Sequence, residues 1–265
     1  NLNQTKSYVT DDGFIIPCID YELRQRLFAE ATKTYGLSKE RQVECIGRSC
    51  AEMCIQLVGG QIRFLPKNNH QKPSILVLAN RGLPQGVYAL CAARLLALRG
   101  CYVNVLIQGS DQTTSLTEFD NELNLFLSCL SDKNESLSNK QQQKSRYLTS
   151  VNDLKSLKSV DLIINGLESN SNILNSLMCT QIWFRTLNKL IEQFFSRVNI
   201  ISLDPCHEGT LLNSKWCIVP VLPLPMSNKC GRVYLCDLGF TPKMFESANI
   251  DYKSPFGSKF LIPLH

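Results

Sequence analysis

One carboxylate stands where an enzyme built on a parallel sheet would place a catalytic acid or base. Asp204 directly follows the apolar run 198–203, and Pro205 comes next. In such sheets ligands bind beyond the carboxyl ends of the strands, and a carboxylate there can move a proton. An aspartate at the end of a strand is also a common turn residue or helix cap, which is the more frequent role. Asp204 is therefore our only candidate catalytic residue, with a turn as the alternative.

Cys206 and His207 lie close behind, and a cysteine beside a histidine suggests a nucleophile and its base. Neighbouring residues rarely point at each other, however, and no third group completes a triad. The histidines at 70, 207 and 265 show no spacing with cysteine or acidic residues that is typical of a zinc site. We predict neither a triad nor a metal site.

A second candidate site is the loop after the apolar run 74–79. Its small and polar residues include Asn80, Gly82 and Gly86. The loop precedes a helix predicted over 87–99, whose first N–H groups could hold a phosphate. The dinucleotide fingerprint GxGxxG is absent, however, because Leu83 and Pro84 stand between the two glycines. A tight connection between strand and helix is the favoured interpretation, and a phosphate cradle is the alternative.

The hydrophobic pattern predicts the elements that must position these residues. The run 74–79 is too short for an ordinary helix and is typical of a strand buried on both faces of a parallel sheet. Good helix formers fill 87–99, Gly100 ends that helix, and a β-branched strand follows at 102–107. Strand, turn, helix and strand make a βαβ unit, so we predict a doubly wound α/β fold. Further strands are expected at 160–165, 198–203, 216–219 and 232–236.

Length and composition agree with one globular domain. The chain has 265 residues, of which 44% are hydrophobic and 19% charged. The 12 cysteines include no CxxC pair, so we expect buried thiols in a reducing compartment rather than a disulfide framework. No apolar stretch approaches the roughly 18 residues that span a bilayer, and no membrane partner is expected. We predict one domain over 14–265, preceded by a linker or flexible arm over 1–13 and interrupted by a polar surface loop at 131–146.

Two helices are expected ahead of the first strand of the sheet, over 21–35 and 38–58. The second has Ser38 as its N-cap and carries apolar residues at steps of three and four: Val43, Ile46, Cys50, Met53 and Leu57. Both helices are additional to a minimal βαβ pattern, so they must cover a face of the sheet or pair with another chain. These five residues are accordingly our candidates for a dimer interface.

The charge balance permits a nucleic-acid partner without demonstrating one. The formal net charge is +5, and lysine and arginine are scattered along the chain. The candidates for RNA contact lie near the first strand of the sheet: Arg63, Lys67, Lys72 and Arg81. Most charged side chains in any protein are only solvated, which is the alternative here.

Several segments together resemble the YjeF N-terminal domain family, in the branch that forms the C-terminal domain of mRNA-decapping enhancers. They include GLSKERQVECIGRSCAEMCIQLVGG, PKNNHQKPSILVLANRGLPQGVYA, IISLDPCHEGTLLNSKWCIVPVLPLP, GRVYLCDLG and SPFGSKFLIPLH, and the resemblance covers about residues 14 to 265. It implies a Rossmann-like three-layer αβα sandwich with a mostly parallel sheet and two extra N-terminal helices.

The resemblance also implies a role. Members of this branch are cytoplasmic scaffolds of processing bodies that self-associate and bring together mRNA, the decapping enzyme complex and a DEAD-box helicase. The enzyme and helicase contacts are expected through regions outside this chain. The resemblance therefore implies an RNA-associated homodimer that promotes mRNA decapping and requires no cofactor.

The wider family includes epimerases that repair hydrated NAD(P)H. Those enzymes carry a Gly- and Asn-rich loop after the first strand and acidic residues at the ends of two later strands. Here the loop lacks its Gly-Gly-Asp, Asn165-Gly166 replaces the first acid, and only Asp204-Pro205 remains of the second motif. The resemblance thus implies a pocket without epimerase turnover. An alternative is a nucleotide-metabolite site or residual epimerase-like enzyme using Asp204, with an NAD-like or ADP-ribose-like ligand held by Asn80, Gly82, Gly86, Asn165 and Asp204.

Overall fold

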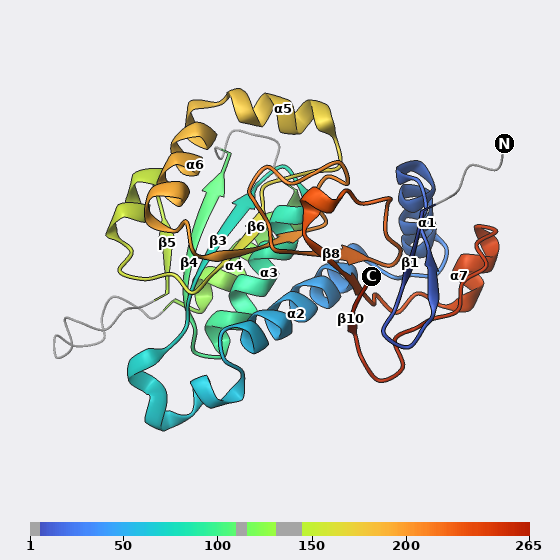
Figure 1. Ribbon diagram of the computed structural model, residues 1–265, viewed down its shortest axis with the longest axis horizontal. Helices are drawn as coiled ribbons and strands as arrows, with labels where there is room; N and C mark the ends of the chain where they lie inside the picture. Colours follow the sequence, from blue (N-terminus) through green and yellow to red (C-terminus); the bar gives the residue numbers. More distant parts are fainter. Residues whose placement is uncertain (1–5, 110–115, 131–144) are drawn as a thin grey trace.

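The computed structural model describes residues 6–109, 116–130 and 145–265 of the chain (Figure 1). Residues 131–144, which make up most of the predicted polar loop, lie outside the described residues. The last position of that loop, Arg146, begins a strand. Within the described parts, no helix is long and apolar enough to cross a membrane.

An eight-stranded sheet forms the centre of the molecule (Figure 1). From edge to edge it contains β10 (Leu261–Pro263), β9 (Arg232–Cys236), β8 (Trp216–Pro220), β7 (Asn199–Leu203), β6 (Leu162–Gly166), β3 (Ser74–Asn80), β4 (Tyr102–Gln108) and β5 (Arg146–Leu148). All neighbouring strands are parallel except β10 and β9. In this order β3 lies beside β6. Strands β4 and β5 continue the sheet on one side, and β7 to β10 continue it on the other. This is the doubly wound arrangement predicted from the sequence.

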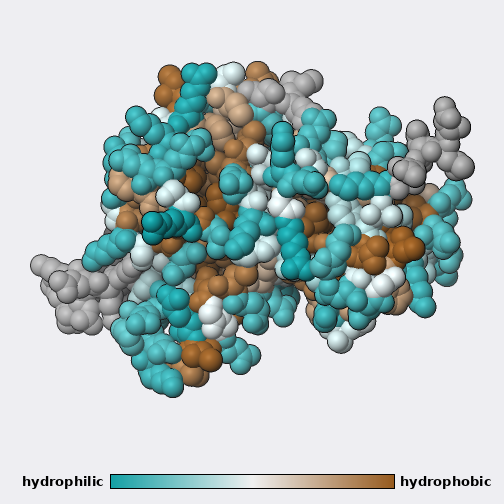
Figure 2. Space-filling model, in the orientation of Figure 1, coloured by the Kyte–Doolittle hydropathy of each residue, from teal (hydrophilic) through white to brown (hydrophobic). Residues whose placement is uncertain are grey.

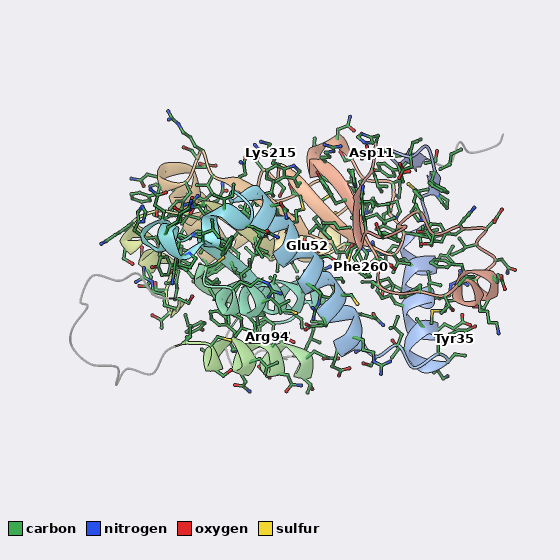
Figure 3. All side chains as sticks on the ribbon, turned by 90° about the horizontal axis from the view of Figure 1, so that it is seen from below. Asp11, Tyr35, Glu52, Arg94, Lys215 and Phe260 are labelled. Atoms are coloured by element: carbon green, nitrogen blue, oxygen red, sulfur yellow. The ribbon has the colours of Figure 1, made fainter. Side chains whose placement is uncertain are left out.

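Helices cover both faces of this sheet. On one face α2 (Lys39–Leu57), α3 (Pro84–Leu98) and α4 (Thr117–Ser128) lie side by side, and on the other lie η3 (Val151–Ser156), α5 (Asn172–Thr180) and α6 (Ile182–Phe194) (Figures 1 and 3). Two hydrophobic cores result, one on each side, because alternate residues of each strand point to opposite faces. The predicted three-layer αβα sandwich is therefore confirmed.

The two extra N-terminal helices do not share one role. α1 (Tyr21–Lys33) lies beside α7 (Pro242–Ser247), away from the centre of the sheet (Figure 1). α2 begins after the N-cap Ser38, as predicted, and packs along α3. Its residues Val43, Ile46, Cys50 and Met53 are buried in the chain's own core. The prediction that these four form a dimer interface is therefore wrong, because the face that looked unpartnered in the sequence is covered by α3. Leu57 is 38% exposed.

The prediction of a linker or flexible arm over 1–13 is also wrong for residues 6–13, which the structure describes. β1 (Ser7–Val9) pairs with β2 (Ile15–Pro17) in an antiparallel hairpin. Val9 and His265 exchange backbone hydrogen bonds of 3.0 and 2.9 Å, so the start of the described chain is tied to its end. Tyr8 is 7% exposed, which explains why this short segment folds onto the domain.

All 12 cysteines are free thiols. Those at 91, 101, 217 and 236, which lie in apolar patterns of the sequence, are buried. They pack as small hydrophobic residues, as the sequence predicts.

Candidate functional site

A buried ion pair lies beyond the carboxyl end of β7. Arg24, on α1, places Nη2 2.9 Å from Oδ1 and 3.0 Å from Oδ2 of Asp204. The two side chains are only 2% and 10% exposed. A guanidinium and a carboxylate this far from water need each other, because either charge alone would be costly to bury. The pair therefore fixes α1 against the carboxyl end of the sheet at β7.

Polar neighbours use the remaining acceptors of Asp204. Gln85 Nε2 donates to the backbone oxygen of Asp204 at 3.1 Å and to Oδ2 at 3.3 Å. The amide of Asn170 accepts from Arg24 Nη2 and donates to the backbone oxygen of Pro205, both at 2.9 Å. Asp204 also has a positive φ of 41°, a conformation that few residues other than glycine adopt. Both oxygens of this carboxylate are thus engaged by groups of the chain itself.

A cavity of about 500 Å³ lies over this network. One wall comes from α1, a second from the start of α3 and a third from the loop after β6. Its lining includes Tyr21, Arg24, Phe28, Gln85, Tyr88 and Asn170. Arg24 Nη1 and Gln85 Oε1 are buried without a hydrogen-bond partner among the described residues. These two atoms are the groups that a polar ligand in the cavity would meet.

The loop residues of the predicted pocket have structural roles instead. Asn80 Oδ1 accepts from the N–H of Gly82 at 3.0 Å, which closes a tight turn. A Cβ on Gly86 would lie 2.0 Å from the backbone oxygen of Asn80, so only glycine lets α3 approach the end of β3. None of the three lines the cavity. The structure therefore supports the connection that we favoured and corrects the pocket assignment.

Asn165 also lies outside the cavity lining. It is 1% exposed and donates to Glu168 and, at 2.8 Å, to Ser202 Oγ. Glu168 is equally buried, and burial raises the pKa of its carboxyl to about 7. The strand ends at 165–168 and 204–208 are neighbours because β6 pairs with β7, but the first forms an internal polar network.

Of the five predicted pocket residues, only Asp204 lines the cavity. Sequence reasoning missed Arg24 and Gln85. A signal for Arg24 was present: it lies three and seven residues before Leu27 and Ala31, on the inward face of α1. A cation on an apolar helix face indicates a buried acidic partner.

The environment of Cys206, close to Asp204, does not suit a nucleophile. Its side chain is 2% exposed, and burial raises the pKa of its thiol. A protonated, buried thiol is a poor nucleophile.

The four RNA candidates do not form one surface. Lys72 precedes β3 and Arg81 follows it, so the strand separates them by about 20 Å. Arg63 pairs with Asp161 at 3.3 Å, and Arg81 pairs with Asp120 at 3.0 Å while being only 8% exposed. Lys67 is exposed. The four candidates therefore do not lie at one place, and their contact with RNA stays a prediction.

One group of potential metal ligands occurs among the described residues, namely Glu44, Cys91 and Glu122. Arg94 lies among them and pairs with Glu44 at 2.5 Å and with Glu122 at 3.0 Å. Its place beside α4 can be followed in Figure 3. The guanidinium already supplies the positive charge, so this cluster joins α2, α3 and α4 and gives no reason to invoke a metal.

Comparison with known proteins decides the family. The model of the YjeF-related protein N-terminus matches residues 39–203, which contain the central βαβ units and end at Leu203, one residue before Asp204. The chain belongs to this family. The crystal structure of yeast ynu0 is similar to this chain over 93% of the chain and 99% of ynu0, with a TM-score of 0.66 at 13% identity, so the two share the fold.

Similar proteins indicate which branch of the YjeF-related family this chain resembles. The chain is 34% identical over 99% of its length to proteins named enhancer of mRNA-decapping protein 3 from Gallus gallus and Homo sapiens. The Drosophila melanogaster protein of that name is 27% identical over 98% of the chain. The chain spans about half the length of the vertebrate relatives, 48% and 47%, and 39% of the fly protein.

Proposed function

We propose that this chain is a scaffold domain that promotes mRNA decapping and processing-body assembly in the cytoplasm. The observation that carries the proposal is the 34% identity, over nearly the whole chain, to proteins named enhancer of mRNA-decapping protein 3. In this proposal the domain self-associates and contacts mRNA, whereas the decapping enzyme complex and a DEAD-box helicase bind through regions outside it.

The chemistry of the site supports a non-enzymatic role. Asp204 is the only acid at the position of an epimerase base, and its charge is neutralised by Arg24 at 2.9 Å. A general base must be free to accept a proton from a bound substrate. Purified protein is therefore expected to show no turnover of hydrated nicotinamide cofactors, and turnover at an epimerase-like rate would overturn the scaffold proposal.

A domain exchange tests the decapping role directly. The matching region of the human relative is replaced by this chain, and the chimera is expressed in cells that lack the relative. Decay of a capped reporter mRNA and the number of processing bodies should recover, relative to a protein without that region. A chimera that is expressed and folded but restores neither would contradict the proposal.

Self-association must use residues other than the core of α2. Three exposed apolar side chains lie at and after the end of that helix: Leu57 (38%), Ile62 (70%) and Leu65 (42%). Leu57 is the last residue of α2, Ile62 lies in η1 (Gln61–Phe64), and Leu65 lies between η1 and η2 (Pro66–Gln71). Sedimentation at micromolar concentration should show a dimer, and Ile62→Asp with Leu65→Asp should shift it towards monomer while circular dichroism is unchanged. A dimer that survives this change places the interface elsewhere, and a monomeric wild type removes self-association from the proposal.

The cavity supports a second candidate function, the binding of an NAD-like or ADP-ribose-like metabolite. Its aromatic walls and the unpaired atoms Arg24 Nη1 and Gln85 Oε1 suit a ring with polar substituents. Calorimetry with NAD, NADH and ADP-ribose should then show binding that weakens in Gln85→Leu. The control is Lys158→Glu, an exposed position before β6, at the end of the strand opposite to the cavity. Binding that ignores the change at Gln85 would contradict this candidate.

A further inference from the structure

A second hollow, of about 400 Å³, lies on the other face of the sheet between η3 and α6. We call it the α6–η3 groove, lined by Asn152, Lys155, Ile182, Arg185, Thr186, Lys189, Leu190 and Gln193. Positions 182, 185, 186, 189 and 193 recur at helical spacing, so they form one stripe along α6. The groove is separated from the Asp204 cavity by the sheet and shares no lining residue with it.

The groove carries positive charge without compensation. Lys155, Arg185 and Lys189 are exposed, and no carboxylate lines the hollow. Among the described residues, none of these three cations takes part in an ion pair. Within the described parts of the chain, the only side-chain hydrogen bond of the three is that of Arg185 Nε, which donates to the backbone oxygen of Cys179 at 3.4 Å. Three neighbouring cations without a partner attract an anionic ligand.

Nearby acids are engaged with other groups. Asp153 on η3 accepts from the backbone N–H groups of Thr149 and Ser150, both at 2.9 Å. Glu192 on α6 accepts from Asn188 at 2.9 Å. Neither carboxylate lines the groove, and among the described residues neither forms an ion pair with one of its three cations.

The apolar residue in the groove distinguishes between anionic partners. Ile182 is 82% exposed, the highest value among the large exposed hydrophobic side chains of the described residues. The lining contains no aromatic side chain on which a nucleic-acid base could stack. The region over α5 and α6 shows hydrophilic and hydrophobic side chains next to each other (Figure 2). An exposed aliphatic side chain flanked by cations fits an aliphatic residue flanked by acids.

We propose that the α6–η3 groove is a docking site for a short acidic peptide segment of a partner protein, anchored by an aliphatic residue against Ile182. Its carboxylates pair with Lys155, Arg185 and Lys189. This inference goes beyond the scaffold proposal and does not depend on self-association or on the Asp204 cavity. It gives the domain a protein-binding surface of its own.

Fluorescence anisotropy tests the proposal with a labelled peptide of alternating Glu and Leu residues. We expect saturable binding that weakens at least about tenfold in the double variant Lys155→Glu/Lys189→Glu, because repulsion replaces attraction. Ile182→Ser should weaken binding several-fold, and a peptide with Gln in place of Glu should bind poorly. The matched control Lys243→Glu/Lys259→Glu makes the same change in net charge near the opposite edge of the sheet and should keep affinity within about twofold.

Three outcomes would overturn the proposal. The first is no peptide binding by the wild type at low salt, and the second is an equal loss of affinity in the control variant, which would indicate attraction by net charge alone. The third is a polyuridine RNA of equal length that binds the groove and loses affinity in the groove variant, while the peptide is unaffected. That result would assign the surface to nucleic acid.

Discussion

At the level of single residues, the pair of Arg24 and Asp204 explains both why the oxygens of Asp204 are occupied and why α1 is held in place. The guanidinium is 2% exposed and bonds both carboxylate oxygens. Removing one partner of such a pair leaves the other charge buried, whereas replacing both with apolar groups removes the problem. The stabilities of the single and double variants therefore distinguish a structural ion pair from a catalytic carboxylate, because a catalytic carboxylate is expected to be dispensable for folding.

Asp204→Ala should therefore lower the free energy of unfolding by about 3–5 kcal/mol, measured by urea denaturation. The double variant Arg24→Met/Asp204→Leu should lose clearly less than the sum of the two single changes, because no unpaired charge remains. Lys39→Met breaks the exposed pair with Glu118 and should cost no more than about 1 kcal/mol. Additive losses in the double variant would show that the two residues act independently.

Glu168 makes stability depend on pH. Burial raises its pKa in the folded chain to about 7, above the ordinary value of 4.5. The folded state thus binds the proton more tightly, so this contribution to stability is complete below about pH 4.5 and is lost as pH rises through about 7. The total change corresponds to about 3 kcal/mol at most.

Glu168→Gln should remove this dependence. The free energy of unfolding of the wild type is expected to fall between about pH 5 and pH 8, and that of the variant should fall much less. Urea denaturation at several pH values gives the two slopes, which are compared instead of the absolute stabilities because the amide also changes the bond with Asn165. The exposed substitution Glu246→Gln is the control. Parallel slopes in wild type and Glu168→Gln would contradict the assignment.

At the level of elements, α3 is the helix against which the site is built. Gly86 lets its first turn approach the end of β3, and Gly166 does the same at β6, where a Cβ would lie 2.5 Å from the backbone oxygen of Gln85. This double approach carries Gln85 to Asp204. The glycines therefore place the helix, and the helix places the polar side chain.

Gly86→Ala should destabilise the protein by about 3 kcal/mol, because the new methyl group meets the rigid backbone of Asn80 instead of a side chain that can move. Thermal unfolding measures the loss. Gly13→Ala is the comparison at an open position: its φ is +80° and nothing lies within 4 Å, so only backbone strain of about 1 kcal/mol is expected. Gly86 has no positive φ, so a loss of no more than about 1 kcal/mol at position 86 would show that a small backbone shift relieves the close approach.

At the level of the whole molecule, the sequence predicted the layers better than the contacts between them. Apolar runs such as 74–79 and 160–165 identify buried parallel strands because water is excluded from both their faces, and these strands are present. The apolar stripe of α2 has no such single meaning: burial against α3 and pairing with another chain produce the same pattern. The contact between Arg24 and Asp204 spans 180 residues, and no local pattern specifies its partner.

The N-terminal hairpin tests how far the domain extends. Polar composition suggested an arm over 1–13, yet Tyr8 is 7% exposed and Val9 exchanges two backbone hydrogen bonds with His265. Deleting residues 1–13 should therefore lower the free energy of unfolding by about 2–4 kcal/mol, from the lost burial of an aromatic ring and the lost bonds. Urea denaturation measures this loss, and hydrogen exchange should quicken at the amide of His265, whose acceptor is removed. Deletion of 1–5 alone keeps β1 and serves as the control. If both deletions leave stability and exchange unchanged, residues 1–13 are not part of the domain. If only the longer deletion lowers stability, the first strand is part of the fold.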